Sequence, residues 1–172
     1  MTRFVWTAWG LLVVVLDLPL AGWDVLPDIV GYAWVVIGLA GATAAPFTTA
    51  RAAALAGIVV AVITGTPLLY VNIGVSVVAL ILDTLVLAVV IHQLCEGLLQ
   101  SAAAEDEETR RWAQRLRIGA YVLLGVGILA VVGALAGAGL LVLLGRLVTA
   151  VIGILTIVLL QRVARSGVLA PD

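Results

Sequence analysis

Long apolar runs, separated by short interruptions, fill most of this 172-residue sequence. A helix needs about 20 apolar residues to cross the roughly 30 Å hydrocarbon core of a bilayer. Dividing the chain at its proline, glycine and polar interruptions predicts about six such spans, at residues 4–20, 29–45, 50–69, 72–98, 118–136 and 140–163. The sequence therefore predicts an all-α fold, a polytopic membrane helical bundle that forms a single transmembrane domain over residues 1–172.

The basic residues give the predicted spans an orientation. All nine are arginine, and eight lie before the first span, at the start of the third, between the fourth and fifth, or at the end of the sixth and just beyond it. These eight are Arg3, Arg51, Arg110, Arg111, Arg115, Arg117, Arg162 and Arg165. The alternate connections, near residues 18–28, 65–72 and 133–140, contain no basic residue. By the positive-inside rule, both termini and a charged linker at 99–117 are predicted to be cytoplasmic.

The first span has an alternative interpretation as a cleaved signal peptide. Arg3 would be its charged start, and Ala21 would precede the cleavage site. Asp17 and Pro19 disfavour a cleavable segment there, so a first membrane helix is the preferred interpretation. Cleavage would not change the orientation of the remaining spans, because the other arginines define it.

Composition excludes several classes of function. With 64% hydrophobic and 11% charged residues, six spans leave no room for a soluble catalytic domain. The single cysteine, Cys95, excludes a disulfide framework and a multi-cysteine metal site. The basic cluster is interleaved with the acidic residues 105–108, which argues against nucleic-acid binding. Zinc-protease, serine-hydrolase and prenyl-diphosphate motifs are absent from the sequence, so neither an enzyme nor a cofactor is predicted. Abundant Ala, Gly, Val and Arg without lysine suggest a GC-rich bacterial genome, and hence the inner (plasma) membrane.

The stretch 101–117 is the only extended polar part of the sequence. Ser101, followed by acidic residues and then by arginines, fits a helix start that is aligned with the helix dipole. Glu107 and Glu108 precede Arg111 by four and three residues, a spacing that brings opposite charges together on one helix face. We therefore expect a solvated cytoplasmic helix in this linker.

Small residues at four-residue spacing predict close packing of helices. They are Gly133 with Gly137, Gly153 with Thr149, and Gly38 with Ala42. Such residues let helix backbones approach closely in lipid. Packing within the chain is the preferred interpretation, while a homo-oligomer or a membrane partner protein stays open. The run AlaLeuAlaGlyAlaGly at 134–139 predicts a tight helical hairpin.

Asp83 is the charge that the sequence places nearest the middle of the membrane. At about 1.5 Å per residue it lies about 16 Å from Asn72, near the bilayer midplane. An isolated charge costs roughly 3 kcal/mol there, so Asp83 should face the bundle interior, be paired, or be protonated. Arg146, about 9 Å below the outer end of the sixth span, is its candidate partner. The pair would either lock two spans together or form a proton- or ion-coupled site in which Asp83 changes protonation.

Asp17, Asp24 and Asp28 form a candidate acidic cluster at the outer face. Pro27 is compatible with a first helical turn, and Asp24 or Asp28 could accept the N–H groups at that helix start. Capping explains at least one of these aspartates. A cation or proton site is the alternative explanation of the cluster.

His92, Cys95 and Glu96 lie at i, i+3 and i+4 near the inner end of the fourth span. Three ligands from one helix make a poor metal site, and the chain has no second histidine or cysteine. His92 and Glu96 are therefore predicted to form a polar edge at the membrane interface. A histidine–carboxylate pair there could also respond to pH.

The segment LeuAspLeuProLeuAlaGlyTrpAspValLeuProAspIleValGlyTyr at 16–32 is followed by ValIleGlyLeu at 36–39 and PheThrThrAlaArg at 47–51. These residues resemble a group of small bacterial integral membrane proteins of unknown function. Members of that group have a short first span, an outer turn of the form Asp-x-Leu-Pro-Asp-x-x-Gly-Tyr, a second span with Gly-Leu, and a Phe-x-x-Ala-Arg run. The resemblance covers residues 5–51 and implies a membrane protein, but no activity.

Two functions fit these features. The sequence favours a structural or accessory membrane protein whose buried charges hold helices together. The alternative is a small proton- or ion-coupled transporter or channel that uses Asp83, Arg146 and the outer aspartates. Two sets of three spans would have opposite topology, as in inverted-repeat transporters, although Asp17 and Asp83 lie at unequal depths in the first span of each set. A polar cavity at Asp83 would favour transport, and a dry pair would favour structure.

Overall fold

The computed structural model describes residues 3–16, 25–64 and 73–166. Within these ranges the chain forms six α-helices and one short 3-10 helix, and no strand. The helices are α1 (Arg3–Leu16), α2 (Val25–Gly38), α3 (Ala45–Thr64), α4 (Ile73–Leu99), η2 (Ala102–Glu105), α5 (Glu107–Leu135) and α6 (Gly139–Ser166). The predicted all-α fold is confirmed.

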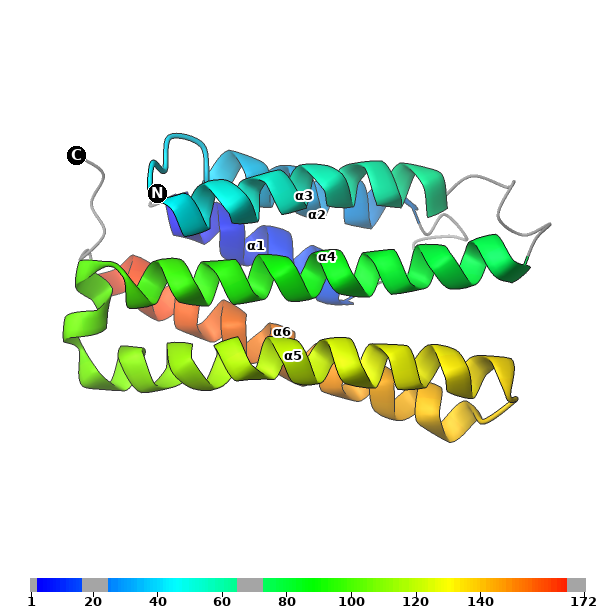
Figure 1. Cartoon of the computed structure of the whole chain (residues 1–172). Helices are drawn as coiled ribbons and strands as arrows, with labels where there is room; N and C mark the ends of the chain where they lie inside the picture. The colour runs from blue at the N-terminus through cyan, green and yellow to red at the C-terminus, as the bar shows by residue number, and fades with distance from the viewer. Residues whose placement is uncertain (1–2, 17–24, 65–72, 167–172) are drawn as a thin grey trace.

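The six α-helices form a closed ring in chain order. Each one packs against the helix before it and the helix after it, and α6 returns to pack against α1. In Figure 1 the ring is flattened into two layers, with α3, α4 and α5 in front and α2, α1 and α6 behind. Buried apolar side chains from all six helices fill the space between them, including Leu11, Leu94 and Leu160.

Four of the described helices are long and apolar enough to cross a membrane. They are α3, the part of α4 from Val77 to Leu99, α5 and α6. Large apolar side chains such as Ile118, Leu129 and Leu140 are exposed on their outer faces, which is unfavourable in water and normal in lipid. The apolar helices α1 and α2 have 14 residues each and are therefore about 21 Å long. The helical architecture thus suggests a membrane protein.

Eight of the nine arginines lie toward one end of the bundle. The helices α1, α3 and α5 begin at this end, and α2, α4 and α6 end there (Figure 1). Arg3, Arg51, Arg110, Arg111, Arg115, Arg117, Arg162 and Arg165 all belong to the helix halves nearest to it. We call it the arginine-rich end. Arg146 belongs to the opposite half of α6.

The turn between α2 and α3 differs from the predicted one. α2 ends at Gly38 rather than near residue 45, and Gly41 in the turn has a φ of 82°, a left-handed conformation that glycine adopts readily. Pro46 lies in the first turn of α3 instead of closing the second span. A proline is tolerated there because the first N–H groups of a helix have no partner within the helix.

The charged linker contributes a largely exposed helical segment, as predicted, but this segment is continuous with the fifth apolar span. α5 runs without a break from Glu107 to Leu135, because no proline or glycine interrupts the charged segment before Gly119. Its N-cap is Asp106, whose carboxylate accepts a hydrogen bond from the Thr109 N–H at 3.3 Å. Ser101, the predicted helix start, instead precedes η2 and donates its hydroxyl to the carbonyl of Leu98.

Glycines set the closest helix contacts. A Cβ atom on Gly153 of α6 would lie 2.4 Å from Val15 of α1, and one on Gly133 would lie 2.6 Å from Leu141. These two glycines therefore pack within the chain, as predicted. Gly137, with a φ of 71°, lies in the short turn between α5 and α6 and confirms the predicted hairpin.

Candidate functional site

Tyr32 of α2 and Asp83 of α4 meet between their helices. The Tyr32 hydroxyl donates a hydrogen bond to Oδ1 of Asp83 at 3.3 Å. The Tyr32 side chain has no exposed surface, and Asp83 is partly buried. Asp83 lies ten residues after the first residue of α4, about 15 Å along the helix axis. This polar contact therefore lies well inside the length of the bundle, as the depth count predicted for Asp83.

Gly57 of α3 supplies the surface on which the Tyr32 ring rests. A Cβ atom at Gly57 would lie 2.8 Å from both Cε1 and Cζ of Tyr32, closer than real contacts allow. The absence of a side chain at Gly57 thus creates the space for the aromatic ring. The hydroxyl of Tyr32 is held by Asp83 of one neighbouring helix while its ring is held by another.

Asp28 belongs to the same site. It lies in the first turn of α2, one turn before Tyr32, so the two side chains share a helix face. Its Oδ1 atom is enclosed by protein, and the carboxyls of Asp28 and Asp83 both lie close enough to act electrostatically on the Tyr32 hydroxyl. The first turn also places Asp28 at the positive end of the helix dipole, as expected for a residue at that helix start. We call these three residues the Asp28–Tyr32–Asp83 cluster.

The predicted pair of Asp83 and Arg146 is not formed in the structure. Arg146 is exposed on α6, and α6 packs mainly against α5 and α1, whereas Asp83 faces Tyr32 of α2. No ion pair of Arg146 occurs among the described residues. The predicted depths of Asp83 and Arg146 in the membrane were compatible with a pair, but the order of the helices in the ring separates the two residues.

The other two outer aspartates, Asp17 and Asp24, lie outside the described residues. The structure therefore describes the predicted outer acidic cluster only at Asp28.

The residues of the predicted polar edge on α4 have different surroundings, because Cys95 faces the core while Glu96 and His92 contact α5. Cys95 is fully buried in the core. Glu96 accepts a bond from Nη1 of Arg117 at 2.6 Å and one from Gln100 at 2.8 Å. The His92 ring packs edge-on against Tyr121, with 5.1 Å between ring centroids. Among the described residues, no group of three or more His, Cys, Asp or Glu residues could hold a metal ion.

Ion pairs tie α6 to the start of α5 at the arginine-rich end. Arg162 pairs with Asp106 at 3.2 Å and with Glu108 at 2.7 Å. Glu107 pairs with Arg111 at 2.8 Å, as predicted, and also with Arg110. Glu108, which was expected to pair with Arg111, instead reaches across to α6.

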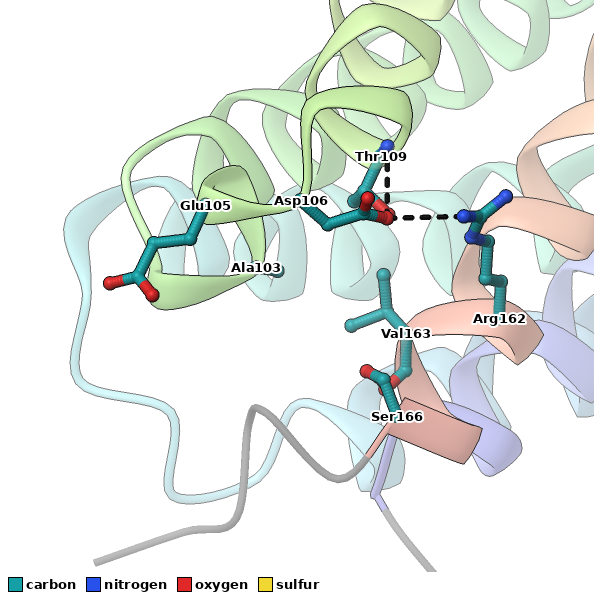
Figure 2. Close-up of a pocket in the computed structure, with 7 residues that line it drawn as sticks. All are labelled: Ala103, Glu105, Asp106, Thr109, Arg162, Val163 and Ser166. Atoms are coloured by element: carbon teal, nitrogen blue, oxygen red, sulfur yellow. Dashed lines mark hydrogen bonds and ion pairs between the residues drawn. The ribbon is translucent and has the colours of Figure 1, made fainter.

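A shallow pocket lies beside these pairs. Figure 2 shows Asp106 facing Arg162 and Thr109, while Glu105 points away from them. The lining residues are Ala103, Glu105, Asp106, Thr109, Arg162, Val163 and Ser166. The hydrogen bond from the Thr109 hydroxyl holds the pKa of the Asp106 carboxyl below its ordinary value, and the Arg162 charge acts in the same direction. The stabilisation from this depressed pKa is present above the ordinary aspartate pKa and is lost as the pH falls through the lowered one.

Tyr32 is the site residue that sequence reasoning missed. A tyrosine near the end of a predicted span is commonly found at the membrane interface, whereas the structure buries Tyr32 completely. The available signal was its spacing, because Tyr32 follows Asp28 by one helical turn and follows Gly31 in the same motif.

The fold and these contacts define a class, an all-helical protein whose long apolar helices suggest a membrane protein. No family model, curated protein or solved structure matches the chain.

Proposed function

We propose that this is a multi-pass protein of the bacterial inner membrane, with six spans and both termini in the cytoplasm. The gathering of eight arginines at one end of the bundle supports this orientation. The exposed tryptophans Trp6 and Trp9 on α1 fit the interfacial region near that end. The ring order supports six spans, because α1 and α2 pack beside the longer helices as members of the same ring.

Cysteine labelling tests the topology. In a Cys95→Ser variant, cysteines placed at Ala102 and at Val168 should react only with reagent on the cytoplasmic side. A cysteine placed at Gly22 should react only from outside. Labelling of positions 22 and 102 from the same face would contradict the orientation. It would not test the role of the Asp28–Tyr32–Asp83 cluster.

Within this architecture we propose that the protein is a small proton- or cation-coupled transporter. The observation that carries the proposal is the hydrogen bond from Tyr32 to Asp83, with Asp28 beside it. The Tyr32 hydroxyl donates to Asp83, and the Asp28 carboxyl lies close enough to act on the same hydroxyl electrostatically. Two carboxyl groups near each other in a low-dielectric environment disfavour carrying two negative charges, which favours binding of a proton or cation. An ionisable cluster of this kind between membrane helices is a natural ion-coupling site.

The order of the helices also supports transport. The helix α1 packs against α2 and α6, and α4 packs in the corresponding way against α5 and α3. Because α1 begins and α4 ends at the arginine-rich end, the two sets of three helices run in opposite directions. Such inverted halves are characteristic of secondary transporters, whose ion sites lie between helices of the two halves. Tyr32 belongs to the first half and Asp83 to the second.

A structural or accessory role is the second candidate. It is favoured by the way in which Tyr32 links three helices, through its ring on Gly57 and its hydroxyl on Asp83. In that role the cluster is a fixed polar contact between α2 and α4 that packs on Gly57 of α3, and its protonation does not change.

Infrared difference spectroscopy separates the two roles. In lipid nanodiscs, the difference between about pH 5 and pH 9 should contain a carboxyl band that Asp83→Asn removes, because an ion-coupling aspartate exchanges protons with water. Asn still accepts a bond from Tyr32, so the variant should remain folded. Replacing sodium by a bulky organic cation should change the band if a metal cation is the coupled ion. A difference spectrum in Asp83→Asn identical to that of the unsubstituted protein would rule out proton exchange at Asp83 and would favour the structural role.

A further inference from the structure

A second set of ionisable side chains joins α4 to α5 nearer the arginine-rich end. His92 and Glu96 are one turn apart on α4, and Arg117 and Tyr121 are one turn apart on α5. His92 contacts Tyr121 ring to ring, and Glu96 pairs with Arg117 at 2.6 Å. The four residues thus form two adjacent cross-helix contacts, one aromatic and one ionic.

The side chains of His92 and Glu96, both on α4, differ in whether their polar atoms have hydrogen-bond partners. Glu96 uses both carboxylate oxygens, with Oε1 accepting from Gln100 and Oε2 accepting from Arg117. The Nδ1 atom of His92 is buried and has no hydrogen-bond partner among the residues that the structure describes. A buried nitrogen without a partner is unusual in a folded protein and calls for an explanation. When an imidazole is protonated both nitrogens become donors, and each then needs an acceptor.

Within the described part of the chain, the surroundings of His92 offer one anionic acceptor. On its own helix Glu96 lies one turn away, and the neighbouring Cys95 is a buried thiol. From α5 the ionisable groups are Arg117 and Tyr121. The α3 helix contributes an apolar contact in this region, between Phe47 and Gly97 of α4. The 3-10 helix η2 contributes the buried Ala103, while its Glu105 is exposed to solvent. A protonated His92 and Arg117 would therefore share a single carboxylate.

We propose that His92, Glu96, Arg117 and Tyr121 form a proton-operated latch between α4 and α5. With His92 neutral, its ring packs on Tyr121 and Glu96 holds Arg117, so the two helices are joined. Protonation turns His92 into a cation, which forms an ion pair with Glu96 of the same helix and repels Arg117. The cross-helix ion pair is then lost, and α5 separates from α4 at the arginine-rich end. The latch does not depend on the proposed transport.

Histidine NMR tests the proton site directly. His92 is the only histidine in the chain, so protein labelled with ¹⁵N-histidine gives one imidazole to follow. Its ring ¹⁵N signals should change from the pattern of an imidazole with one protonated nitrogen to that with two as the sample is taken from about pH 8 to about pH 5. A ring that stays in one protonation state across this range would overturn the proposal.

Spin-label distances test the opening of the latch. Labels at the exposed positions Ala52 of α3 and Gln114 of α5, in a Cys95→Ser background, report the position of α5 relative to the α3–α4 side. Their distance distribution should shift to longer values at about pH 5 than at about pH 8, with the same midpoint as the NMR titration. His92→Gln should keep the shorter distance at both pH values. Glu96→Gln should show the longer distance at both, because it removes the carboxylate that holds Arg117.

The matched variants make the result decisive. Distances that do not change with pH in the unsubstituted protein would contradict the latch. The same pH dependence in His92→Gln would show that another group moves α5, and would equally reject it. Loss of the Asp83 infrared band, or its persistence, has no bearing on either outcome.

Discussion

Replacing Gly10 by alanine is expected to force α1 away from α2 and strongly destabilise the protein. A Cβ atom at Gly10 would lie 2.5 Å from the carbonyl oxygen of Gly31 and 2.8 Å from the backbone nitrogen of Val35. Both neighbours are backbone atoms of α2, so no side-chain rotation relieves the overlap. Overpacking of this kind costs about 1–3 kcal/mol and occasionally more. Denaturant or thermal unfolding in detergent would measure the loss.

Gly125→Ala is the matched control for this prediction. No atom lies within 4 Å of the position of its Cβ, and the residue is exposed on α5. Alanine is favoured over glycine in a helix by about 1 kcal/mol in water, so the substitution should be neutral or mildly stabilising. Gly31→Ala should behave like Gly10→Ala, because its Cβ would meet Val14 and the Gly10 carbonyl. Equal effects at Gly10 and Gly125 would show that the α1–α2 contact is looser than the structure indicates.

The sequence predicted the all-helical fold and the positions of the long apolar helices well because apolar length is a local property. Long apolar runs mark α4 and α6 to within three residues at each end, and the arginines gather at one end as the charge pattern indicated. Helix boundaries were less predictable where two local signals competed. Pro46 can close one helix or open the next, and the turn at Gly41 settles the choice in favour of α3.

Contacts between helices were harder to predict because they depend on ring order and helix rotation. The spacing of Asp83 and Arg146 gave compatible depths, yet depth along the membrane does not determine which helices are neighbours. Tyr32, which donates a hydrogen bond to Asp83, is neutral, and a tyrosine carries no charge pattern that would reveal such a contact. Glu108 shows the same effect, since the i,i+3 spacing to Arg111 was outweighed by Arg162 on another helix.

The second large effect is expected at Gly57, where alanine should disrupt the Asp28–Tyr32–Asp83 cluster itself. The new methyl group would overlap the Tyr32 ring, which is fully buried and anchored at its hydroxyl by Asp83. Either the ring moves and the hydrogen bond lengthens, or α3 moves away from α2. We expect Gly57→Ala to destabilise the protein by about 1–3 kcal/mol. It should also shift the Asp83 carboxyl band, since that band depends on the bond from Tyr32.

A double-mutant cycle with Tyr32→Leu distinguishes this overlap from a general effect on α3. Leucine is shorter than tyrosine, so Gly57→Ala should be much better tolerated in the Tyr32→Leu background, with a coupling of about 0.5–3 kcal/mol. Gly119→Ala serves as the control, because the nearest atoms to its Cβ belong to Ile152 at 3.7 Å, an ordinary contact. If Gly57→Ala were additive with Tyr32→Leu, the glycine would not be what makes room for the ring. The position of the Tyr32 ring would then not depend on α3, and Tyr32 would link α2 to α4 without linking either helix to α3.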